Sequence, residues 1–264
     1  MPISSGLSGS RVLVTASSQG IGFGAARAFL AEGARVVVNS SNAERLARAT
    51  RELAGAGEVH GVVADLRERA DLDRLLRETV GHLGGLDTLV YVTGSPRPGI
   101  YMDQSFEDWS AASNLLVVSP AYLARRAAEA MLAGPGGGRM VFLTSFAIRE
   151  PIPNIATSSV CRIAVAGLVR TLARELGPKG IRVNGILPGY IATERVDEVL
   201  ADAARRHGTT IDAERAALAR EIPLGRVGTT EELARTIVFL GSEMSSYVSG
   251  ALLPVDGALL RSVG

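Results

Sequence analysis

Short β-branched apolar runs alternate along the chain with longer segments in which apolar residues recur at helical spacing. The runs predict strands at 11–15, 35–39, 59–64, 86–92, 139–144, 182–187 and 251–255, and the periodic segments predict helices at 22–33, 43–53, 69–82, around 106–132 and at 158–176. Strands this apolar are buried on both faces, as in parallel sheets that helices cover on each side. We therefore expect an α/β fold: a Rossmann-type, doubly wound sheet of about seven mostly parallel strands with right-handed crossovers.

No Pro/Ser-rich linker and no internal repeat divides the chain, so we expect residues 1–264 to form a single dinucleotide-binding domain. The least regular long segment is 191–223, rich in Ala, Arg, Asp and Glu between two proline-containing turns. In this fold class the ligand crevice lies at the carboxyl ends of the strands. We interpret 191–223 as a helical excursion that covers this crevice, with a solvated pair of surface helices as the alternative.

The charge and cysteine content limit the possible partners. The 264 residues include 28 basic and 27 acidic ones, a net charge of +1, which gives no electrostatic reason to expect nucleic acid or an anionic membrane. The single cysteine, Cys161, excludes an intrachain disulfide framework and favours a reducing compartment. We expect no apolar stretch to reach the roughly 18 residues needed to span a bilayer, and 1–11 lacks the pattern of a signal peptide. We expect a cytoplasmic protein that acts on a small molecule.

The histidines and the lysine narrow the chemistry. His60, His82 and His207 are scattered without a carboxylate partner or metal-ligand spacing, so we expect no metal site. The 28 basic residues comprise 27 arginines and one lysine, Lys179. Any mechanism that needs a lysine amine has a single candidate.

The turn between the first strand and the first helix, 14–22, is rich in small residues. Glycines there let the backbone approach a pyrophosphate, while free N–H groups and the helix dipole stabilise its charge. Thr15, Gly20 and Gly22 in this turn resemble the T-G-x-x-x-G-x-G fingerprint of the short-chain dehydrogenase/reductase family, with Ala16 in place of the first glycine.

Further matches extend the resemblance from about residue 10 to residue 257. They are Asp65 after the third strand, Gly94 after the fourth, Pro188-Gly189 with Thr193, and the segments 222–226, 231–232 and 255–257. The resemblance implies a nicotinamide dinucleotide cofactor, and a homotetramer or homodimer built through the helices at 106–132 and 158–176. With the turn, it implies cofactor contacts at Thr15, Ser17, Ser18, Gly20, Ile21, Gly22, Ser40, Ser41, Asp65, Leu66, Gly94, Arg162, Pro188, Gly189, Ile191 and Thr193.

The end of the second strand indicates which nicotinamide is preferred. A carboxylate at this corner binds the ribose hydroxyls of NAD and repels the 2′-phosphate of NADP. Here the corner reads Asn39-Ser40-Ser41-Asn42, without a carboxylate. We therefore expect NADP in preference to NAD. Arg45, one turn into the next helix, either reaches the phosphate or is merely solvated.

The catalytic signature of the family is Y-x-x-x-K on the long helix with a serine about thirteen residues upstream. Ser145 stands at the upstream position, while Ser158 and Arg162 replace the tyrosine and the lysine. The i, i+4 spacing keeps both replacements on one helix face. The family's helix-four asparagine is also in doubt, because Asn114 lies close to that position but Leu116 is in register.

The replacements change the chemistry. A serine hydroxyl ends roughly 4 Å nearer the backbone than a tyrosine hydroxyl, judged from bond lengths. Arg162 stays cationic and can hold ribose hydroxyls or a substrate carboxylate or enolate oxygen, but it is a poor proton shuttle. Alternatively, Ser158 and Arg162 only cap and solvate the helix start. Tyr91 and Tyr190 border the crevice and offer a phenol, although packing is the common role of a tyrosine at such a place.

Three functions remain open from the sequence. The first is an NAD(P)-dependent oxidoreductase that interconverts a carbonyl and an alcohol with catalytic residues Ser145, Ser158 and Arg162, the hydroxyl of Ser158 holding a water. The second is a non-redox enzyme on the same scaffold, such as an isomerase, dehydratase or cyclase. The third is a catalytically silent protein that binds a cofactor or a partner. Fold alone does not choose between them.

Overall fold

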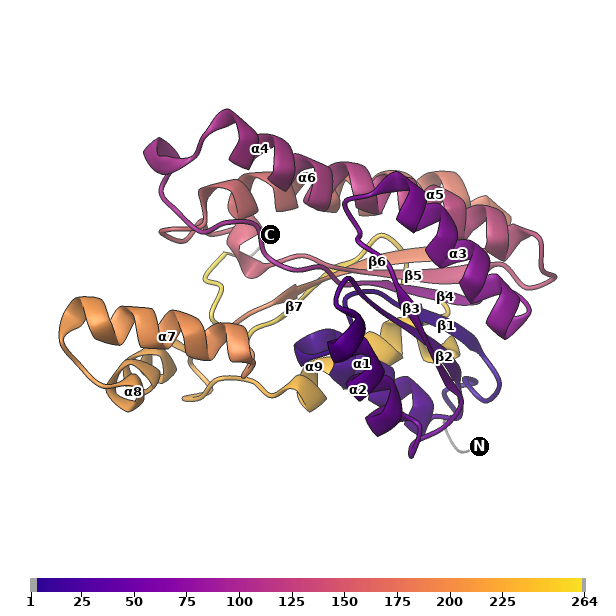
Figure 1. The fold of residues 1–264 in the computed structure, drawn as a ribbon, viewed down its shortest axis with the longest axis horizontal. Coiled ribbons are helices and arrows are strands. Elements are labelled where there is room, and N and C mark those ends of the chain that lie inside the picture. The colour runs from indigo at the N-terminus through magenta and orange to yellow at the C-terminus, as the bar shows by residue number, and fades with distance from the viewer. Residues whose placement is uncertain (1–3, 263–264) are drawn as a thin grey trace.

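The computed structural model describes residues 4–262, apart from the side chain of Arg195. Its strands form one seven-stranded sheet in the order β3-β2-β1-β4-β5-β6-β7 (Figure 1). The strands are β1 (Arg11–Val14), β2 (Arg35–Ser40), β3 (Val59–Val63), β4 (Thr88–Tyr91), β5 (Gly138–Leu143), β6 (Ile181–Pro188) and β7 (Leu252–Val255). Each neighbouring pair is parallel, which confirms the expected doubly wound sheet.

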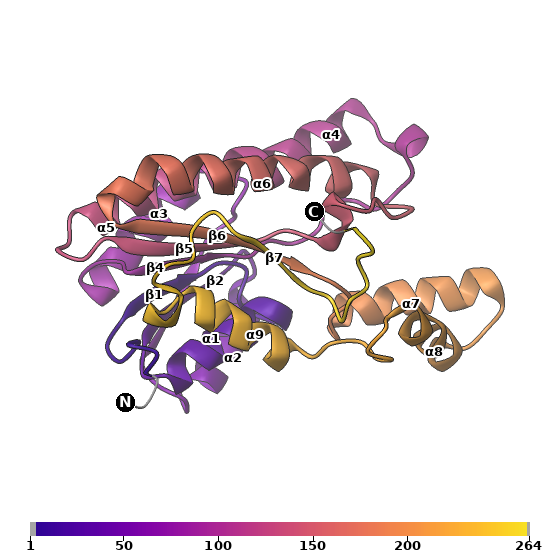
Figure 2. The ribbon, with the colours of Figure 1, turned by 180° about the vertical axis from the view of Figure 1, so that it is seen from behind.

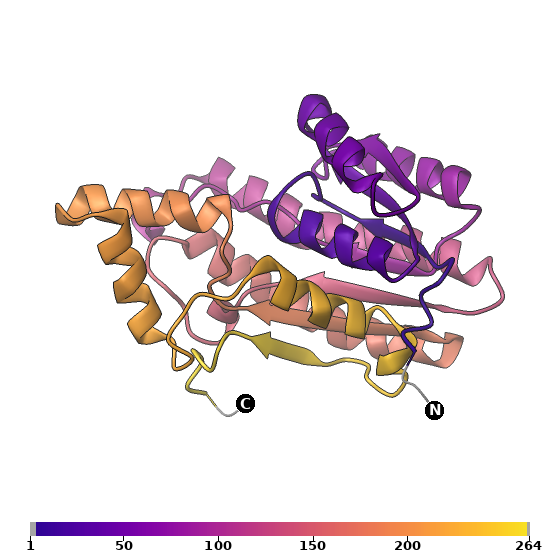
Figure 3. The same ribbon diagram turned by 90° about the horizontal axis from the view of Figure 1, so that it is seen from below.

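Helices cover both faces of this sheet (Figures 1 and 2). One layer contains α1 (Gly20–Ala31), α2 (Ala43–Leu53) and α9 (Thr230–Leu240), and the other contains α3 (Arg69–Leu83), α4 (Phe106–Ser113), α5 (Ser119–Leu132) and α6 (Ala156–Leu176). Two further helices, α7 (Glu194–His207) and α8 (Ile211–Glu221), extend beyond the body of the sheet (Figure 3). The strand order reverses between β1 and β4, and this switch point is where such folds bind ligands.

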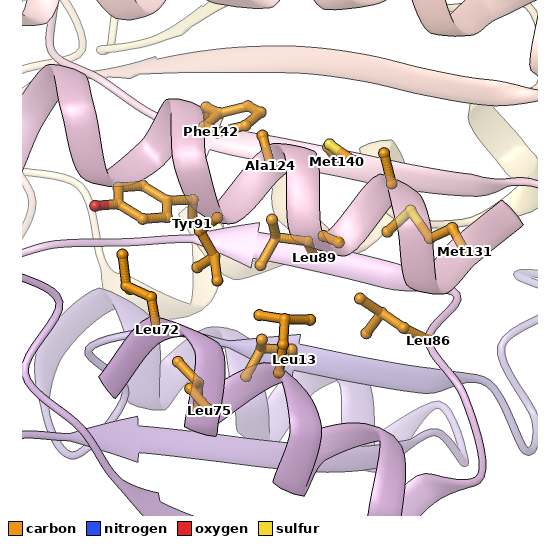
Figure 4. Packing of buried hydrophobic residues seen from close by; sticks show 14 of the residues in the cluster. Leu13, Leu72, Leu75, Leu86, Leu89, Tyr91, Ala124, Met131, Met140 and Phe142 are labelled. Carbon is orange, nitrogen blue, oxygen red and sulfur yellow. The ribbon is translucent and has the colours of Figure 1, made fainter. Parts of the chain in front are cut away.

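Alternate residues of each strand supply two separate cores. Leu13 and Leu89 face the α3/α5/α6 layer, where they pack with Leu75 (Figure 4). Val12 and Val90, one position away, belong to the core under α1 and α9. Because side chains alternate between faces with a period of two and both faces are buried, the strands read as continuous apolar runs.

Two helical segments differ from the sequence expectations. α9 was not predicted, although Thr229 and Glu232 form the capping box that marks a helix start. The expected helix around 106–132 is divided by a π-helical turn at Asn114–Val118. The other elements agree with the expectations to within a few residues at their ends, the usual margin at frayed termini.

The helix α6 qualifies the expectation about apolar stretches. By length and composition, Ala156–Lys179 is long and apolar enough to cross a membrane, although the sequence has no unbroken apolar run of that length. In the fold, Cys161, Val165 and Val169 are buried and α6 packs against β6. Packing in the protein core accounts for only part of the apolar character of this helix, because 33% of its most apolar window is buried.

Candidate functional site

A cavity of about 800 Å³ opens at the carboxyl ends of the strands. Segments far apart in the chain line it: the turn after β1, the ends of β2, β4, β5 and β6, and the first turns of α6 and α7. Of the residues expected in the site, it brings together Ser18, Gly20, Ile21, Gly22, Ser40, Ser41, Asp65, Leu66, Gly94, Ser145, Ser158, Arg162, Pro188, Gly189 and Thr193.

Thr15, Ser17 and Ile191, also expected to touch the cofactor, do not line this cavity. Thr15 Oγ1 donates to Val92 O at 2.6 Å and accepts from Val92 N at 2.9 Å, so its hydroxyl joins β1 to the end of β4. Ser17 Oγ donates to Val14 O. Ile191 is buried in the core beneath α1 and α9. The side chains of these three residues hold the walls of the cavity in place.

The turn into α1 is shaped to receive an anion. Within the described chain, no side chain caps the first N–H groups of α1, and Gly20, Ile21 and Gly22 line the cavity. A Cβ on Gly22 would lie 2.5 Å from Ala16 O, so only glycine fits there. Ala16 itself has φ +44°, a left-handed conformation that glycine adopts without strain. A pyrophosphate fits here, because the N–H groups at this helix N-terminus are uncapped and the glycine backbone lets a ligand approach them closely.

Asn39 stands at the floor of this turn, a role that the sequence reasoning missed. Its Oδ1 accepts from Ala16 N at 3.2 Å, and its Nδ2 donates to Val62 O at 3.2 Å and Ala64 O at 3.0 Å. The buried amide thus ties the turn to β2 and β3. The signal for it was an asparagine, 1% exposed in the fold, at the end of an apolar strand.

The corner after β2 presents hydroxyls and a guanidinium. Ser40 and Ser41 line the cavity together with Arg45, and Ser18 Oγ donates to Ser40 Oγ at 3.1 Å. Arg45 is exposed, and its Nη1 donates to Gln19 Oε1 at 3.4 Å, which directs the side chain across the corner. This set of donors and a positive charge complements a phosphate.

Asp65 lies on the neighbouring wall and is paired with Arg67, whose Nη2 donates to Asp65 Oδ2 at 2.6 Å. The hydrogen bonds from Arg67 lower the pKa of Asp65. The carboxylate therefore remains ionised, and its charge is balanced locally by a residue that also lines the cavity.

Ser145 lies two residues after the end of β5, at the chemical end of the cavity. Its Oγ accepts from Ala147 N at 3.1 Å, capping the short helical turn Phe146–Ile148. Since the hydroxyl accepts a hydrogen bond from the backbone, its proton is available to a ligand.

Ser158 and Arg162 meet on the cavity-facing side of α6. Arg162 Nε donates to Ser158 Oγ at 3.1 Å, and Arg162 Nη1 donates at 3.3 Å to both Leu143 O and Thr144 O. Each of the two residues is 8% exposed, so the reading in which they merely cap and solvate the helix start is wrong. Burial lowers the pKa of Arg162 to about 10, which leaves it cationic near neutrality.

The other candidate acids have structural roles. Tyr91 is 2% exposed, packs against Phe142 and donates from its hydroxyl to Leu115 O at 3.1 Å (Figure 4). Tyr190 packs against Phe146 with ring centroids 5.3 Å apart. Burial raises the pKa of both phenols. Among the described residues, no tyrosine lines the cavity.

The positions of Asn114 and Leu116 show that neither takes the place of the family's helix-four asparagine. Asn114 Nδ2 donates to Arg67 O at 2.9 Å, away from the chemical end, and Leu116 is buried in the core beside α6. The π-helical turn that contains both residues could not be read from the apolar pattern.

Two segments enclose the chemical end. The loop 94–98 lines the cavity, and it is fixed by hydrogen bonds from Gly99 N to Asn154 O and from Ala156 N to Gly99 O. Glu194, Glu198 and Val199 of α7 line it from the other side, whereas none of the described residues of α8 does. Only the first half of the excursion at 191–223 therefore reaches the crevice.

Thr93 and Thr144 are further lining residues that the sequence reasoning missed. Each is the sequence neighbour of an expected site residue, so its place next to the end of a strand was the signal that could have indicated it. Thr93 Oγ1 is buried and has no hydrogen-bond partner among residues 4–262. Across the same residues, no group of three or more His, Cys, Asp or Glu side chains is arranged to hold a metal ion.

These features define a doubly wound α/β protein with a phosphate-compatible crevice at its switch point. A family model described as enoyl-(acyl carrier protein) reductase matches residues 15–259. The uncharacterized oxidoreductase YvrD of Bacillus subtilis is 34% identical over 261 residues, 96% of this chain and 97% of that protein. Bovine dehydrogenase/reductase SDR family member 4 is 34% identical over 250 residues, 94% of this chain and 86% of that protein.

The fold is shared with solved structures. That of L-sorbose reductase from Gluconobacter frateurii, complexed with NADPH and L-sorbose, superposes with a TM-score of 0.94 at 30% identity, covering 99% of this chain and 100% of that one. The chain therefore belongs to the short-chain dehydrogenase/reductase family, as its motifs predicted.

Proposed function

We propose that this protein is an NAD(P)-dependent oxidoreductase that interconverts a carbonyl and an alcohol on a small molecule, with NADP(H) as the preferred dinucleotide. The observation that carries the proposal is the single cavity in which a pyrophosphate-compatible helix start and the hydroxyls of Ser145 and Ser158 face one ligand space. Family membership and the NADPH complex of the sorbose reductase support it.

The cavity residues fit the dinucleotide. The N–H groups of Gly20, Ile21 and Gly22 would hold the pyrophosphate. Ser40, Ser41 and Arg45 would hold the 2′-phosphate of NADP, because no carboxylate among the described residues of that corner opposes it. Asp65, Leu66 and Gly94 would line the adenosine side, and Pro188, Gly189 and Thr193 the nicotinamide side. Thr15, Ser17 and Ile191 would act through the walls that they stabilise.

A bound nicotinamide would supply a hydride to, or accept one from, the carbon that bears the reacting oxygen. Ser145 and Ser158 would donate hydrogen bonds to this oxygen as negative charge develops on it. The guanidinium of Arg162, which is 8% exposed and hydrogen-bonded to Ser158, would stabilise this charge. A water held by the Ser158 hydroxyl delivers the proton.

Magnitudes decide whether such a site can work. Losing a positioned general acid costs about 10²–10⁴ in rate. One well-placed oxyanion donor contributes about 10²–10³ in kcat. Ser145 is common to the family signature, so only Ser158 and the buried cation of Arg162 can replace part of what the missing phenol would supply, and a slow oxidoreductase is the expected result.

The test is a binding and turnover experiment on the purified protein. We expect NADPH to bind more tightly than NADH in calorimetry, and a panel of ketones and aldehydes to oxidise NADPH as followed by its absorbance. Tight binding without turnover would instead indicate a silent cofactor-binding protein. Product formation with the dinucleotide neither oxidised nor reduced would indicate a non-redox enzyme.

We further propose that residues 1–264 work as one dinucleotide-binding domain in a cytoplasmic homotetramer or homodimer. Val118 on the π-helical turn before α5, and Val160 and Ile163 on α6, are exposed apolar residues, and a smaller cavity lies between α5 and α6. Two such helix faces from different copies can cover each other, as the resemblance implied. Sedimentation equilibrium tests this, and a monomer at micromolar concentration would contradict it.

A further inference from the structure

Arg162 is a buried cation without a countercharge. No carboxylate among the described residues forms an ion pair with it, whereas the ion pairs of the other described arginines and histidines join exposed or half-buried groups. Buried charges are normally paired, because an isolated ion in a poorly solvated environment is costly. A cavity-lining guanidinium that lacks its partner indicates that the ligand supplies the negative charge.

The hydrogen bonds of Arg162 show which nitrogen of its guanidinium group can bind a ligand. Nε is engaged by Ser158 Oγ, and Nη1 by Leu143 O and Thr144 O. These three bonds fix the plane of the guanidinium against the end of β5. Nη2 has no hydrogen-bond partner within the described part of the chain, so its two N–H groups remain for a ligand.

The neighbouring hydroxyls are also arranged as donors. Ser158 Oγ accepts from Arg162 Nε, and Ser145 Oγ accepts from Ala147 N, so each hydroxyl retains its proton for the cavity. Thr93 Oγ1, on the same cavity, is buried without a protein partner among residues 4–262. A cluster of donors around a cation recognises anionic oxygens, through charge-assisted hydrogen bonds that are roughly twice as strong as neutral ones.

The acidic residues of the cavity belong to other parts of the site than Arg162. Asp65 is paired with Arg67 at the other end, and Glu194 and Glu198 enter from α7. The groups that act on the Arg162 charge are Tyr91 and Cys161, and burial is the main cause of its lowered pKa. The hydrogen bonds of Arg162 go to a serine hydroxyl and to backbone carbonyls, and no carboxylate among the described residues forms an ion pair with it.

Building on the proposed oxidoreductase activity, we propose that Arg162 determines substrate specificity by binding a carboxylate next to the reacting carbonyl, so that the substrate is a 2-oxo acid or the corresponding 2-hydroxy acid. Arg162 Nε lies 3.1 Å from Ser158 Oγ. A carboxylate at Nη2 and a carbonyl oxygen at the Ser158 hydroxyl must then be close neighbours. Adjacent oxygens of a 2-oxo acid lie roughly 3 Å apart, judged from bond lengths.

The step balances without a further reactant. In reduction, the carbonyl carbon gains a hydride from the reduced nicotinamide, the electrons of the carbonyl π bond move to oxygen, and this oxygen takes one proton from water. The nicotinamide is oxidised and the 2-oxo acid becomes a 2-hydroxy acid. The carboxylate keeps its charge throughout and stays on Arg162.

Binding of unreactive probes tests the inference independently of turnover. Calorimetry on the protein saturated with NADPH, and again without it, compares oxamate with its neutral amide oxamide. Benzoylformate and benzoylformamide, whose ketone groups can be reduced, are compared only on the protein without NADPH. We expect each anion to bind about 10–100-fold more tightly than its neutral counterpart, as for a hydrogen bond to a charged group. Arg162→Met should abolish this preference, and Arg162→Lys should retain part of it.

The control is Arg48→Met, which removes an exposed arginine from α2 at a position outside the cavity. It should leave the anion preference unchanged. If Arg162→Met fails to fold, as judged by circular dichroism, Arg162→Gln and Arg162→Lys provide the comparison. Equal binding of anion and amide by the natural protein in both pairs overturns the inference, as does a preference that survives removal of the Arg162 charge.

Failure of this inference is distinguishable from failure of the proposed function. Turnover of neutral ketones with no anion preference would keep the oxidoreductase and reject the oxo-acid specificity. A clear anion preference without any turnover would support the anion site and reject the oxidoreductase.

Discussion

Arg162 Nε donates to Ser158 Oγ at 3.1 Å across one turn of α6, at the two positions where the family signature has lysine and tyrosine. The pair keeps the i, i+4 geometry of that signature while exchanging its chemistry. A phenol that transfers protons has become a short hydroxyl, and an amine has become a guanidinium whose remaining donors are directed by backbone carbonyls.

Restoring the signature should restore the general acid. The double variant Ser158→Tyr/Arg162→Lys is expected to raise kcat on neutral ketones by on the order of 10² or more, because a positioned acid contributes about 10²–10⁴. The cavity of about 800 Å³ into which position 158 opens gives the larger side chain room. Steady-state kinetics measures the gain. An unchanged kcat with intact NADPH affinity would show that the serine pair is not the limiting feature.

Removing the Ser145 hydroxyl should slow the chemical step without weakening the cofactor. Ser145→Ala is expected to lower kcat about 10²–10³-fold, as for loss of one oxyanion donor, and to leave the Kd of NADPH within about twofold. Ser145→Thr retains the hydroxyl on a backbone that is already extended at φ −164°, and serves as the control. A fall in NADPH affinity equal to the fall in kcat would argue for a binding role instead.

Arg45 should contribute to the choice of dinucleotide. Arg45→Ala is expected to weaken NADPH binding about 10-fold or more, in line with loss of a hydrogen bond to a charged group, and to leave NADH binding unchanged. Fluorescence titration of the reduced nucleotides measures both constants. Arg48→Ala on the same helix is the matched control, since Arg48 is exposed and does not line the cavity. Equal losses for the two nucleotides would place the 2′-phosphate elsewhere.

Two substitutions in the turn into α1 are expected to have opposite effects on the stability of the fold. Gly22→Ala brings a Cβ to within 2.5 Å of Ala16 O and should both destabilise the fold and abolish dinucleotide binding. Ala16→Gly relieves a left-handed φ of +44°, worth about 1 kcal/mol, and should raise or leave unchanged the free energy of unfolding. Thermal denaturation and NADPH titration measure both. A well-bound nucleotide in Gly22→Ala would contradict the close backbone approach.

Arg11 and Asp87 form an ion pair at the amino ends of the strands, opposite the cavity. This pair should make the free energy of unfolding depend on pH. Burial raises the pKa of Asp87, but hydrogen bonds from the Arg11 side chain and backbone outweigh this and lower it from 3.8. A carboxyl whose folded-state pKa is depressed stabilises the fold above its unfolded value and loses this contribution as the pH falls through the folded value.

Asp87→Asn should therefore cost about 1–2 kcal/mol of unfolding free energy at pH 7, with the two proteins converging below about pH 4. Denaturant unfolding at a series of pH values provides the comparison. Glu44→Gln, on the exposed first turn of α2, is the control and should follow the natural protein. A constant difference between Asp87→Asn and the natural protein across this range would refute the linkage.

The apolar pattern was sufficient for the sheet. Val12 and Leu13 are adjacent in the sequence and enter different cores, and this two-sided burial is what makes a parallel strand readable as an unbroken apolar run. The apolar pattern alone did not predict α9, whose start is marked instead by the Thr229/Glu232 capping box. It also did not predict the π-helical turn at Asn114–Val118, because the register shift of this turn does not change the hydrophobic pattern.

The sequence by itself determined the fold class, the residues at the strand ends and the replacement of the catalytic tyrosine and lysine. Only the tertiary structure decided which of these residues face the ligand space. Thr15 and Ser17 hold the cavity walls, Arg45 turns toward Gln19, and Tyr91 is enclosed by the core. The physical reason is that spacing along a chain fixes the face on which a side chain lies, whereas its hydrogen-bond partners and exposure depend on elements that are distant in sequence.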